Sequence, residues 1–423
     1  MSLSSSSCCR VEKLEQRQLL AYTLTKLNFD TAAGANLQTG LDNTPDVNTA
    51  GQVAGPRIAA TIFDHAEVQV VRSGKTKFID VGNLGSTIDS FGRGLNDKNQ
   101  FVGNWTDSKG VNHAFFSALS KTDKATVAKL GDVKGESGAV AFAVNNKALV
   151  VGEAGETTGK SVGVVWTPAT GGKFTTTALP RLSTHSQIPG FVGPAIANDV
   201  NDAGVIVGTA IDSVARQRAV LWKKGSNGAY AVTDLGSLPG NLQVSLAFAI
   251  NSKGVIAGQA AAKDLSEHAA LWAPNSKGKY SIIDLGGPGL PLSAVATDLN
   301  TAGVVVGNVD VANGGLPHAA IWTKKSGKYV MTDLNKLLPK TSGWELNQAT
   351  SINDAGVIVG TGVFQNGNAT FELTPNSAAG SSIKVASLST SHARQLAPPS
   401  SPSPDAKKHV QFSDNLIDLA QLV

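Results

Sequence analysis

The stretch VNDAGVIVG (200–208) decides the fold, because it returns six more times along the chain. Each copy has an apolar residue, an Asn, two or three small polar residues and a short β-rich run that ends in Gly. The other copies are VNTAGQVAG (47–55), LNDKNQFVG (95–103), VNNKALVVG (144–152), INSKGVIAG (250–258), LNTAGVVVG (299–307) and INDAGVIVG (352–360). Successive closing glycines are 48, 49, 56, 50, 49 and 53 residues apart. Such spacing indicates equal structural units with loop insertions between them.

The repeated Asn predicts a hairpin turn in every unit. Three residues after the Asn, five copies have Gly, whereas Asn99 and Ala148 take that place in the other two. An Asn at the first turn position bonds the turn backbone, and Gly or Asn adopts a positive φ without strain. Ala148 therefore predicts a turn that is strained or differently shaped.

Two further runs follow each phrase, so that every unit has four expected strands, which we call a, b, c and d. Strand a ends at the Asn, strand b ends at the closing Gly, strand c resembles RAVLW (218–222) and strand d resembles AYAVTDLGSL (229–238). Four antiparallel strands in a repeat of 40 to 50 residues are typical of a β-propeller blade. A solenoid of stacked units is the alternative.

The chain ends favour a closed ring. The last unit has strands a, b and c (347–373) but no fourth run, and AYTLTKLNF (21–29) supplies one at the N-terminus. Tyr22 aligns there with Tyr230, Tyr280 and Tyr329. We therefore expect an all-β, seven-bladed propeller of four-stranded antiparallel blades over residues 20–376, closed by the N-terminal strand completing the last blade.

Composition excludes several classes of protein. Of 423 residues, 16% are charged, the net charge is +4 and the basic residues are scattered, which argues against a nucleic-acid partner. No apolar run approaches the 18 or so residues of a membrane span. The two cysteines are Cys8 and Cys9, so the repeats have no disulfide, Cys metal site or thiol nucleophile.

The repeats resemble the HAF family of extracellular repeats, named for the motif seen here at His113, Ala114 and Phe115. Those repeats combine N-D-x-G-x-x-V-G, HA-φ-φ-W and DLG-x-L phrases, which residues 45–373 match throughout. The third unit departs from the pattern, with Val162 and Gly163 in place of His-Ala and FTTTALPRL in place of the DLG phrase. The resemblance implies an extracellular or cell-surface location and no defined activity.

The two ends of the chain differ from the repeats. RVEKLEQRQLLA (10–21) resembles the V-E-x-L-E-x-R-x-L-L segment of exported planctomycete proteins, so residues 1–19 are interpreted as an export segment. A short charged helix leading into the first strand is the alternative. Residues 377–423 read as a Ser/Pro-rich disordered tail with a short C-terminal helix, although SSIKVASL (381–388) can add an edge strand.

Repeated polar and aromatic residues have mostly structural interpretations. Four histidines begin strand c in their units: His65, His113, His268 and His318. We expect each to form a hydrogen bond with the backbone of a loop rather than to belong to a ring of metal or anion ligands. The strand d acids are expected to anchor a turn, and they are Asp80, Asp234, Asp284 and Asp333. Four units have a tryptophan at the end of strand c: Trp166, Trp222, Trp272 and Trp322. We expect these side chains to pack between blades rather than to stack on sugars.

Acids in the b-to-c loops have two interpretations. They are either solvated loop acids, which we favour, or a ring that binds cations or sugar hydroxyls. The residues concerned are Asp64, Asp107, Glu153, Glu156, Asp212, Asp264, Glu267 and Asp310.

Binding is predicted where the repeat is interrupted. The longest d-to-a insertions are PRLSTHSQIPGFVGP (180–194) and LNKLLPKTSGWELNQ (334–348). Loops on a rigid scaffold tend to carry function, so we expect exposed aromatic and charged groups there to bind a ligand. The candidate ligand-binding residues are Arg181, His185, Trp344 and Glu345.

The sequence carries no catalytic signature, metal motif or cofactor motif. We therefore expect a non-catalytic, exported, monomeric scaffold that binds an unknown protein or glycan at the cell surface, with no cofactor, metal, nucleic acid or membrane span. One alternative is a secreted propeller enzyme, a hydrolase or lyase acting on polysaccharide, with the insertions forming its cleft. Another is a matrix or adhesion component held by its tail.

Overall fold

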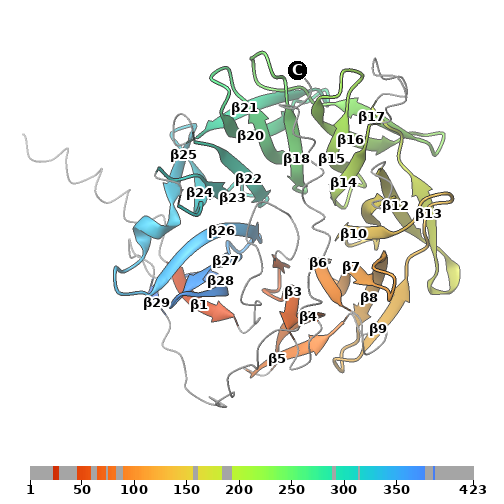
Figure 1. Cartoon of the computed structure of the whole chain (residues 1–423), viewed down its shortest axis with the longest axis horizontal. Helices are drawn as coiled ribbons and strands as arrows, with labels where there is room; N and C mark the ends of the chain where they lie inside the picture. Colours follow the sequence, from red (N-terminus) through yellow and green to blue (C-terminus); the bar gives the residue numbers. More distant parts are fainter. Residues whose placement is uncertain are drawn as a thin grey trace, which may run out of the picture.

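The computed structural model confirms a seven-bladed, all-β propeller. Seven sheets surround a central axis like the blades of a propeller, as Figure 1 shows. The structure describes residues 22–27, 45–58, 64–72, 75–81, 89–155, 161–182, 193–287, 292–312, 315–376 and 384–385. The predictions for residues 1–19 and for most of the tail lie outside these residues and stay predictions.

Six blades are four-stranded antiparallel sheets in sequence order a, b, c, d. Blade 1 consists of β2 (Asp46–Val47), β3 (Val53–Ile58), β4 (Asp64–Arg72) and β5 (Lys75–Asp80). Blade 2 consists of β6 (Ser90–Leu95), β7 (Gln100–Thr106), β8 (Asn112–Leu119) and β9 (Ala125–Lys129). Blade 3 consists of β10 (Ala139–Val144), β11 (Val150–Ala154), β12 (Val162–Pro168) and β13 (Phe174–Ala178), with the short 3₁₀ turn η2 (Thr170–Gly172).

The second half of the ring repeats this arrangement. Blade 4 consists of β14 (Ala195–Val200), β15 (Ile206–Ile211), β16 (Gln217–Lys224) and β17 (Tyr230–Asp234). Blade 5 consists of β18 (Ser245–Ile250), β19 (Ile256–Ala261), β20 (Glu267–Pro274) and β21 (Tyr280–Gly286). Blade 6 consists of β22 (Ala294–Leu299), β23 (Val305–Val309), β24 (His318–Lys325) and β25 (Lys328–Asp333), followed by the 3₁₀ turn η3 (Leu334–Leu337).

Blade 7 closes the ring as the sequence predicts. It contains β26 (Trp344–Ile352), β27 (Ile358–Phe364) and β28 (Gly367–Pro375), and β1 (Tyr22–Leu27) pairs antiparallel with β28. Tyr22 lies opposite Pro375 just as Tyr280 lies opposite Pro274, so the predicted alignment of the tyrosines is confirmed. β29 (Lys384–Val385) pairs parallel with β1 as a fifth, edge strand, within the segment expected to supply one.

The closing glycine is required by a bulge in strand a, and it lies inside strand b, which continues beyond the end that the sequence predicts: β15 runs to Ile211, three residues past Gly208. In blade 4 the pairing register shifts between Ala197 and Asp199. A Cβ built on Gly208 would lie 1.9 Å from the carbonyl oxygen of Ile196. No side chain fits at that distance, so only glycine lets the two strands pair. The closing glycines of blades 2, 3, 5, 6 and 7 have the same close approach, 1.8 to 2.0 Å.

The a-to-b turn has one shape even where the sequence departs from it. Gly204 has a φ of +77° and its N–H donates to Asn201 O at 2.9 Å. Ala148 has a φ of 58° and its N–H donates to Asn145 O, also at 2.9 Å. The turn at Ala148 is therefore the strained case of the two that the sequence allowed, because a side chain occupies the left-handed region.

The hydrophobic core lies between neighbouring blades. One cluster joins Val207 and Leu221 of blade 4 to Ala247 and Trp272 of blade 5, and comparable clusters fill the other interfaces. All four strand c tryptophans are fully buried, which confirms packing and leaves no ring face for a sugar. Three of them also donate their indole N–H to a carbonyl of the preceding blade, in the pairs Trp166–Gly131, Trp222–Pro180 and Trp272–Gly236.

Candidate functional site

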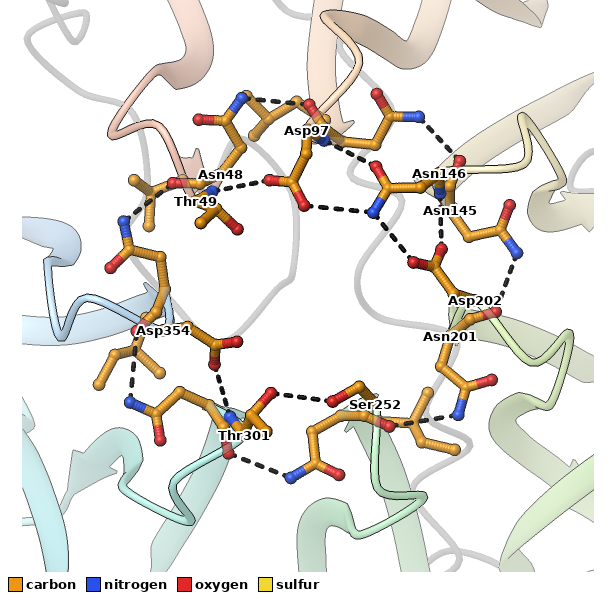
Figure 2. Close-up of a pocket in the computed structure, with 18 of the residues that line it drawn as sticks. Asn48, Thr49, Asp97, Asn145, Asn146, Asn201, Asp202, Ser252, Thr301 and Asp354 are labelled. Atoms are coloured by element: carbon orange, nitrogen blue, oxygen red, sulfur yellow. Dashed lines mark hydrogen bonds between the residues drawn. The ribbon is translucent and has the colours of Figure 1, made fainter.

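A closed ring of seven asparagines surrounds the propeller axis, one at the end of each strand a. Each donates its side-chain N–H to the backbone carbonyl of the asparagine in the next blade, over 2.7 to 3.3 Å (Figure 2). The ring runs through Asn48, Asn96, Asn145, Asn201, Asn251, Asn300 and Asn353 and returns to Asn48. All seven side chains are buried.

Each asparagine also organises its own turn. Asn145 Oδ1 accepts the backbone N–H groups of Lys147 at 2.9 Å and Leu149 at 3.0 Å. The same acceptor is used in the other six turns. The amide therefore needs both its oxygen for the turn and its nitrogen for the next blade, which explains why no other residue type occurs at this position.

The residue after each asparagine contributes to a second ring of polar side chains, nearer the central opening (Figure 2). Its members are Thr49, Asp97, Asn146, Asp202, Ser252, Thr301 and Asp354. Asn146 donates from its amide to Asp97 at 3.2 Å and to Asp202 at 3.0 Å. Ser252 and Thr301 share a hydroxyl contact of 2.9 Å, and Thr301 N donates to Asp354 at 2.7 Å. Figure 2 shows these groups arranged around the central opening.

These two rings line a pocket on the axis, which we call the axial pocket. Its volume is about 320 Å³, and the apolar residue before each asparagine completes its lining. Asp97, Asp202 and Asp354 are exposed at its rim. No Lys or Arg belongs to the lining among the described residues, so the pocket has negative charges and amide and hydroxyl groups. No set of three His, Cys, Asp or Glu side chains within the described ranges has the geometry of a metal site.

Three further carboxylates lie two residues before an asparagine, around the same axis. Asp46, Asp199 and Asp298 each accept a backbone N–H of the next blade, from Leu95 at 3.0 Å, Ile250 at 2.7 Å and Ile352 at 2.8 Å respectively. Burial raises the pKa of Asp199 to about 7 and the pKa of Asp298 to about 8, and repulsion from Asp46 adds to both. Burial also raises the pKa of Asp46.

The opposite face of the ring carries the b-to-c and d-to-a loops, and we call it the loop face. There a basic side chain of strand c pairs with the strand d aspartate in four blades. The pairs are His65–Asp80 at 2.8 Å, His268–Asp284 at 2.9 Å, His318–Asp333 at 2.9 Å and Arg218–Asp234 at 3.0 Å. The histidines thus bond a carboxylate and not the backbone that the sequence led us to expect.

The predicted anchoring role of the strand d aspartates is confirmed. Asp234 and Asp284 accept the N–H of Gly236 and Gly286 at 2.8 and 2.7 Å, which holds the turn that follows. His113 departs from the pattern, since its imidazole lies 3.2 Å from Asp107 in its own b-to-c loop.

The b-to-c loop acids Asp107 and Asp212 hold their own loops, whereas Asp310 accepts the backbone N–H of Ser293 before β22. Asp212 Oδ1 accepts the backbone N–H of Val214 and Arg216, and its other oxygen pairs with the Arg216 side chain at 2.8 Å. Asp107 accepts two backbone N–H groups in the same way. Backbone hydrogen bonds from the turn lower the pKa of Asp107. Burial raises the pKa of Asp212, but its turn hydrogen bonds and the ion pair with Arg216 together outweigh burial and lower that pKa.

The predicted ligand-binding residues lie on different blades. Arg181 follows strand d of blade 3 and donates to the carbonyls of Ser161 and Gly193, which fastens the insertion to the ring. His185 lies outside the described residues. Trp344 and Glu345 begin β26 in blade 7, three blades beyond blade 4, where the first insertion ends. The described parts of the two insertions are therefore not brought together.

Trp344 corrects the expectation of an exposed aromatic group. It is 9% exposed and packs on Phe364 and Phe371, with ring centroids 4.9 and 6.4 Å apart. Asn335 holds the insertion against the blade, because its side chain donates to Leu346 O and accepts from Leu346 N. Much of the second insertion is therefore an extension of strand a, and Glu345 is exposed on it.

The sequence predicts the turns but not the axial pocket, because the turn alone accounts for an asparagine at this position. The turn uses only the side-chain oxygen of the asparagine, and, among the described residues, its amide nitrogen has a partner in the same hairpin only in blades 1 and 2, where it donates to Gln52 and Gln100. The position after the asparagine is polar in all seven units, which is a second periodic signal. Both signals point to the axis only when the units are placed in a ring.

Comparison with known proteins identifies a family. Residues 160–383, more than half of the chain, match the family described as protein of unknown function (DUF3466). The chain belongs to the DUF3466 family. The matching region of this DUF3466 protein begins just before β12 in blade 3 and runs to the segment before β29. No curated protein matches the chain.

Two solved structures are similar to parts of the chain. TolB from Acinetobacter baumannii is 14% identical with a TM-score of 0.42, and the match covers 67% of this chain and 63% of TolB. Trypanosoma rangeli sialidase in complex with 2,3-difluorosialic acid is 10% identical with a TM-score of 0.32, and the match covers 82% of this chain and 56% of the sialidase. The chain thus spans less than two thirds of either protein.

Proposed function

We propose that this DUF3466 protein is a non-catalytic scaffold, exported to the cell surface, that binds a protein or carbohydrate ligand. The observation that carries the proposal is the axial pocket, where carboxylate, amide and hydroxyl groups from all seven blades converge. The HAF-like repeats and the N-terminal export-like segment support the location.

The chemistry of the rim suits a ligand rich in hydroxyl or amide groups. Asp97, Asp202 and Asp354 accept hydrogen bonds, Asn146 both donates and accepts, and Thr49 and Ser252 contribute hydroxyls. Sugar hydroxyls and peptide backbones offer the complementary donors and acceptors. The closed asparagine ring beneath the rim fixes these groups before a ligand arrives, and preorganisation of this kind raises affinity because little ordering remains.

The structural use of the repeated polar residues supports a scaffold. The asparagines, the histidines of four blades and several loop acids are engaged in hydrogen bonds that hold blades and turns. Such residues are unsuited to a reaction that requires them to move or to exchange partners.

An enzyme acting on polysaccharide is the second candidate, because of Asp199 and Asp298. A carboxyl with its pKa raised to about 7 or 8 can act as a general acid near neutral pH. Neither residue belongs to the lining of the axial pocket, so this activity would need a site other than that pocket.

The test measures binding of the full chain to a glycan array and to a displayed peptide library. The pocket variant combines Asp202→Ala with Asp354→Ala, and the matched loop-face variant combines His185→Ala with Glu345→Gln. We expect the pocket variant to lose binding and the loop-face variant to retain it. Loss in the loop-face variant alone would move the binding site to the insertions. Polysaccharide turnover that disappears in Asp298→Asn would replace the scaffold by the enzyme.

A further inference from the structure

A single hydroxyl group lies between two carboxylates where the ring closes. Ser351 Oγ of blade 7 is 2.7 Å from Asp46 Oδ1 of blade 1 and 2.9 Å from Asp298 Oδ2 of blade 6. Both separations are hydrogen-bond distances for two oxygens. Three consecutive blades therefore meet at one serine side chain.

Two hydrogen bonds between Ser351 Oγ and carboxylate oxygens require two hydrogens. With both carboxylates ionised, only the hydroxyl hydrogen is available, so one is missing. A serine hydroxyl has one hydrogen, so it donates to one carboxylate only, and an ionised carboxylate has none to give. The other contacts are backbone N–H groups, from Val47 and Leu95 to Asp46 and from Leu299 and Ile352 to Asp298, and Val47 N also lies 3.4 Å from Ser351 Oγ. They place no hydrogen between Ser351 and the second carboxylate.

We infer that Asp46, Ser351 and Asp298 share one additional proton, and that this proton makes the closing junction of the ring a pH-sensitive lock. One carboxyl group donates to Ser351 Oγ, and Ser351 donates to the other carboxylate. Loss of the proton leaves two negative charges facing one hydroxyl. The charges then repel each other, and the contact between blades 6, 7 and 1 weakens.

The surrounding charges favour retention of the proton near neutral pH. Asp97 after β6 and Asp199 on β14 are further acids near the group, and with burial they help to raise the pKa of Asp46 and Asp298. Arg93 on β6 donates to Asn104 Oδ1 and lies over the Phe142 ring. Lys98 in the next turn and Glu345 at the far end of β26 are exposed. Among the described charged side chains, no cation forms an ion pair with Asp46 or Asp298.

The lock is specific to this junction among the described blades. The equivalent position holds Gly94, Ala143 and Ala249 in blades 2, 3 and 5, which have no group to share a proton. Asp199 in blade 4 bonds backbone N–H groups alone, since Ala249 occupies the place of Ser351 in the next blade. Blade 7 is also the blade that the N-terminal strand completes, so the lock lies where the ring depends on a non-covalent closure.

The first measurement is the infrared spectrum of the full chain at pH 7 and pH 9.5. We expect the carbonyl band of a protonated carboxyl group at pH 7, its disappearance at pH 9.5, and a weaker band at pH 7 in Asp298→Asn or Asp46→Asn. Asp199→Asn removes the carbonyl band of the Asp199 carboxyl group and serves as the matched control. If the Asp199→Asn chain has no protonated carboxyl band at pH 7, the inference is wrong, whatever the other variants do.

The second measurement is hydrogen exchange between pH 6 and pH 9.5, corrected for the intrinsic rate of each amide. We expect opening of β2 and β26 to increase at least tenfold relative to β10 in the wild-type chain and in Asp199→Asn. In Asp298→Asn and Asp46→Asn the increase should vanish, because the amide is neutral at every pH and no second charge forms beside Ser351. An increase that persists in both variants, or that is equal in all blades, would overturn the lock.

Discussion

Replacing Asn145 by Ala tests whether the asparagine ring holds the blades together. The side chain donates to Asn201 O of the next blade at 2.8 Å and accepts from Lys147 N at 2.9 Å and Leu149 N at 3.0 Å. Asn145 is 5% exposed, so water cannot replace all three partners. The substitution therefore removes one inter-blade bond and two bonds that shape the turn.

The expected loss follows from the number of bonds. A hydrogen bond contributes about 1 kcal/mol net, and Asn201 O keeps its hydrogen bond from Gly204 N when the Asn145 amide is removed. Three lost bonds lower the free energy of unfolding by about 3 kcal/mol. Asn145→Asp keeps the oxygen that accepts from the turn and loses the inter-blade donor, so it should destabilise mainly through the contact with Asn201.

Urea denaturation followed by tryptophan fluorescence measures both variants, because four tryptophans lie fully buried between the blades. The Asp variant also carries an internal control. Below pH 4 its introduced carboxyl group is protonated and can donate again to Asn201 O, so part of its stability should return there relative to the wild-type chain. A loss under about 1 kcal/mol for Asn145→Ala would refute the role assigned to the ring, since a single ordinary hydrogen bond is worth that much.

Three other outcomes are expected. Ala148→Gly should raise the free energy of unfolding by about 0.5 to 1 kcal/mol because it relieves a positive φ, whereas Gly204→Ala should lower it, and equal effects of the two would contradict the common turn shape. Deletion of residues 1–29 should remove β1 from blade 7 and lower the melting temperature; unchanged melting would mean that β1 does not close the ring. Asp199 and Asp298 hold protons up to about pH 7 and pH 8 in the folded chain, whereas an unfolded Asp releases its proton near pH 4. The folded chain thus binds more protons in between, so stability should fall as pH rises from 5 to 8, by about 1.4 kcal/mol per pH unit for each proton, and urea midpoints that stay constant would exclude this.

Local sequence rules account for the blades. The Asn-to-Gly spacing predicted the turns, the closing glycine marked the strand b position where a carbonyl lies 1.9 Å from a would-be Cβ, and Tyr22 identified the strand that completes blade 7. These features depend on contacts within one hairpin or one sheet. They repeat seven times, so the pattern was readable without an alignment of related chains.

The candidate site was less predictable from the sequence. Arg181 and Trp344 are candidates from the sequence because they lie in insertions that interrupt the repeat. In the structure Arg181 donates hydrogen bonds to backbone carbonyls that hold its insertion, and Trp344 is buried against Phe364 and Phe371. An insertion can add a strand extension or a free loop, and its composition does not distinguish the two. The His–Asp pairs were also missed, because strands c and d place those residues side by side only through their register.

The sequence by itself determined the number of blades and their strand order, because these follow from the repeated phrase, and the means of closure, because the strand-like run that the last unit lacks is present at residues 21–29. Only the tertiary structure decided what lies on the axis. Asn353 and Asn48 are 305 residues apart in the chain and become neighbours when the ring closes. The same closure brings Asp46 and Asp298 to one hydroxyl of Ser351. Interactions between blades depend on the radius and curvature of the ring, and no single repeat encodes these.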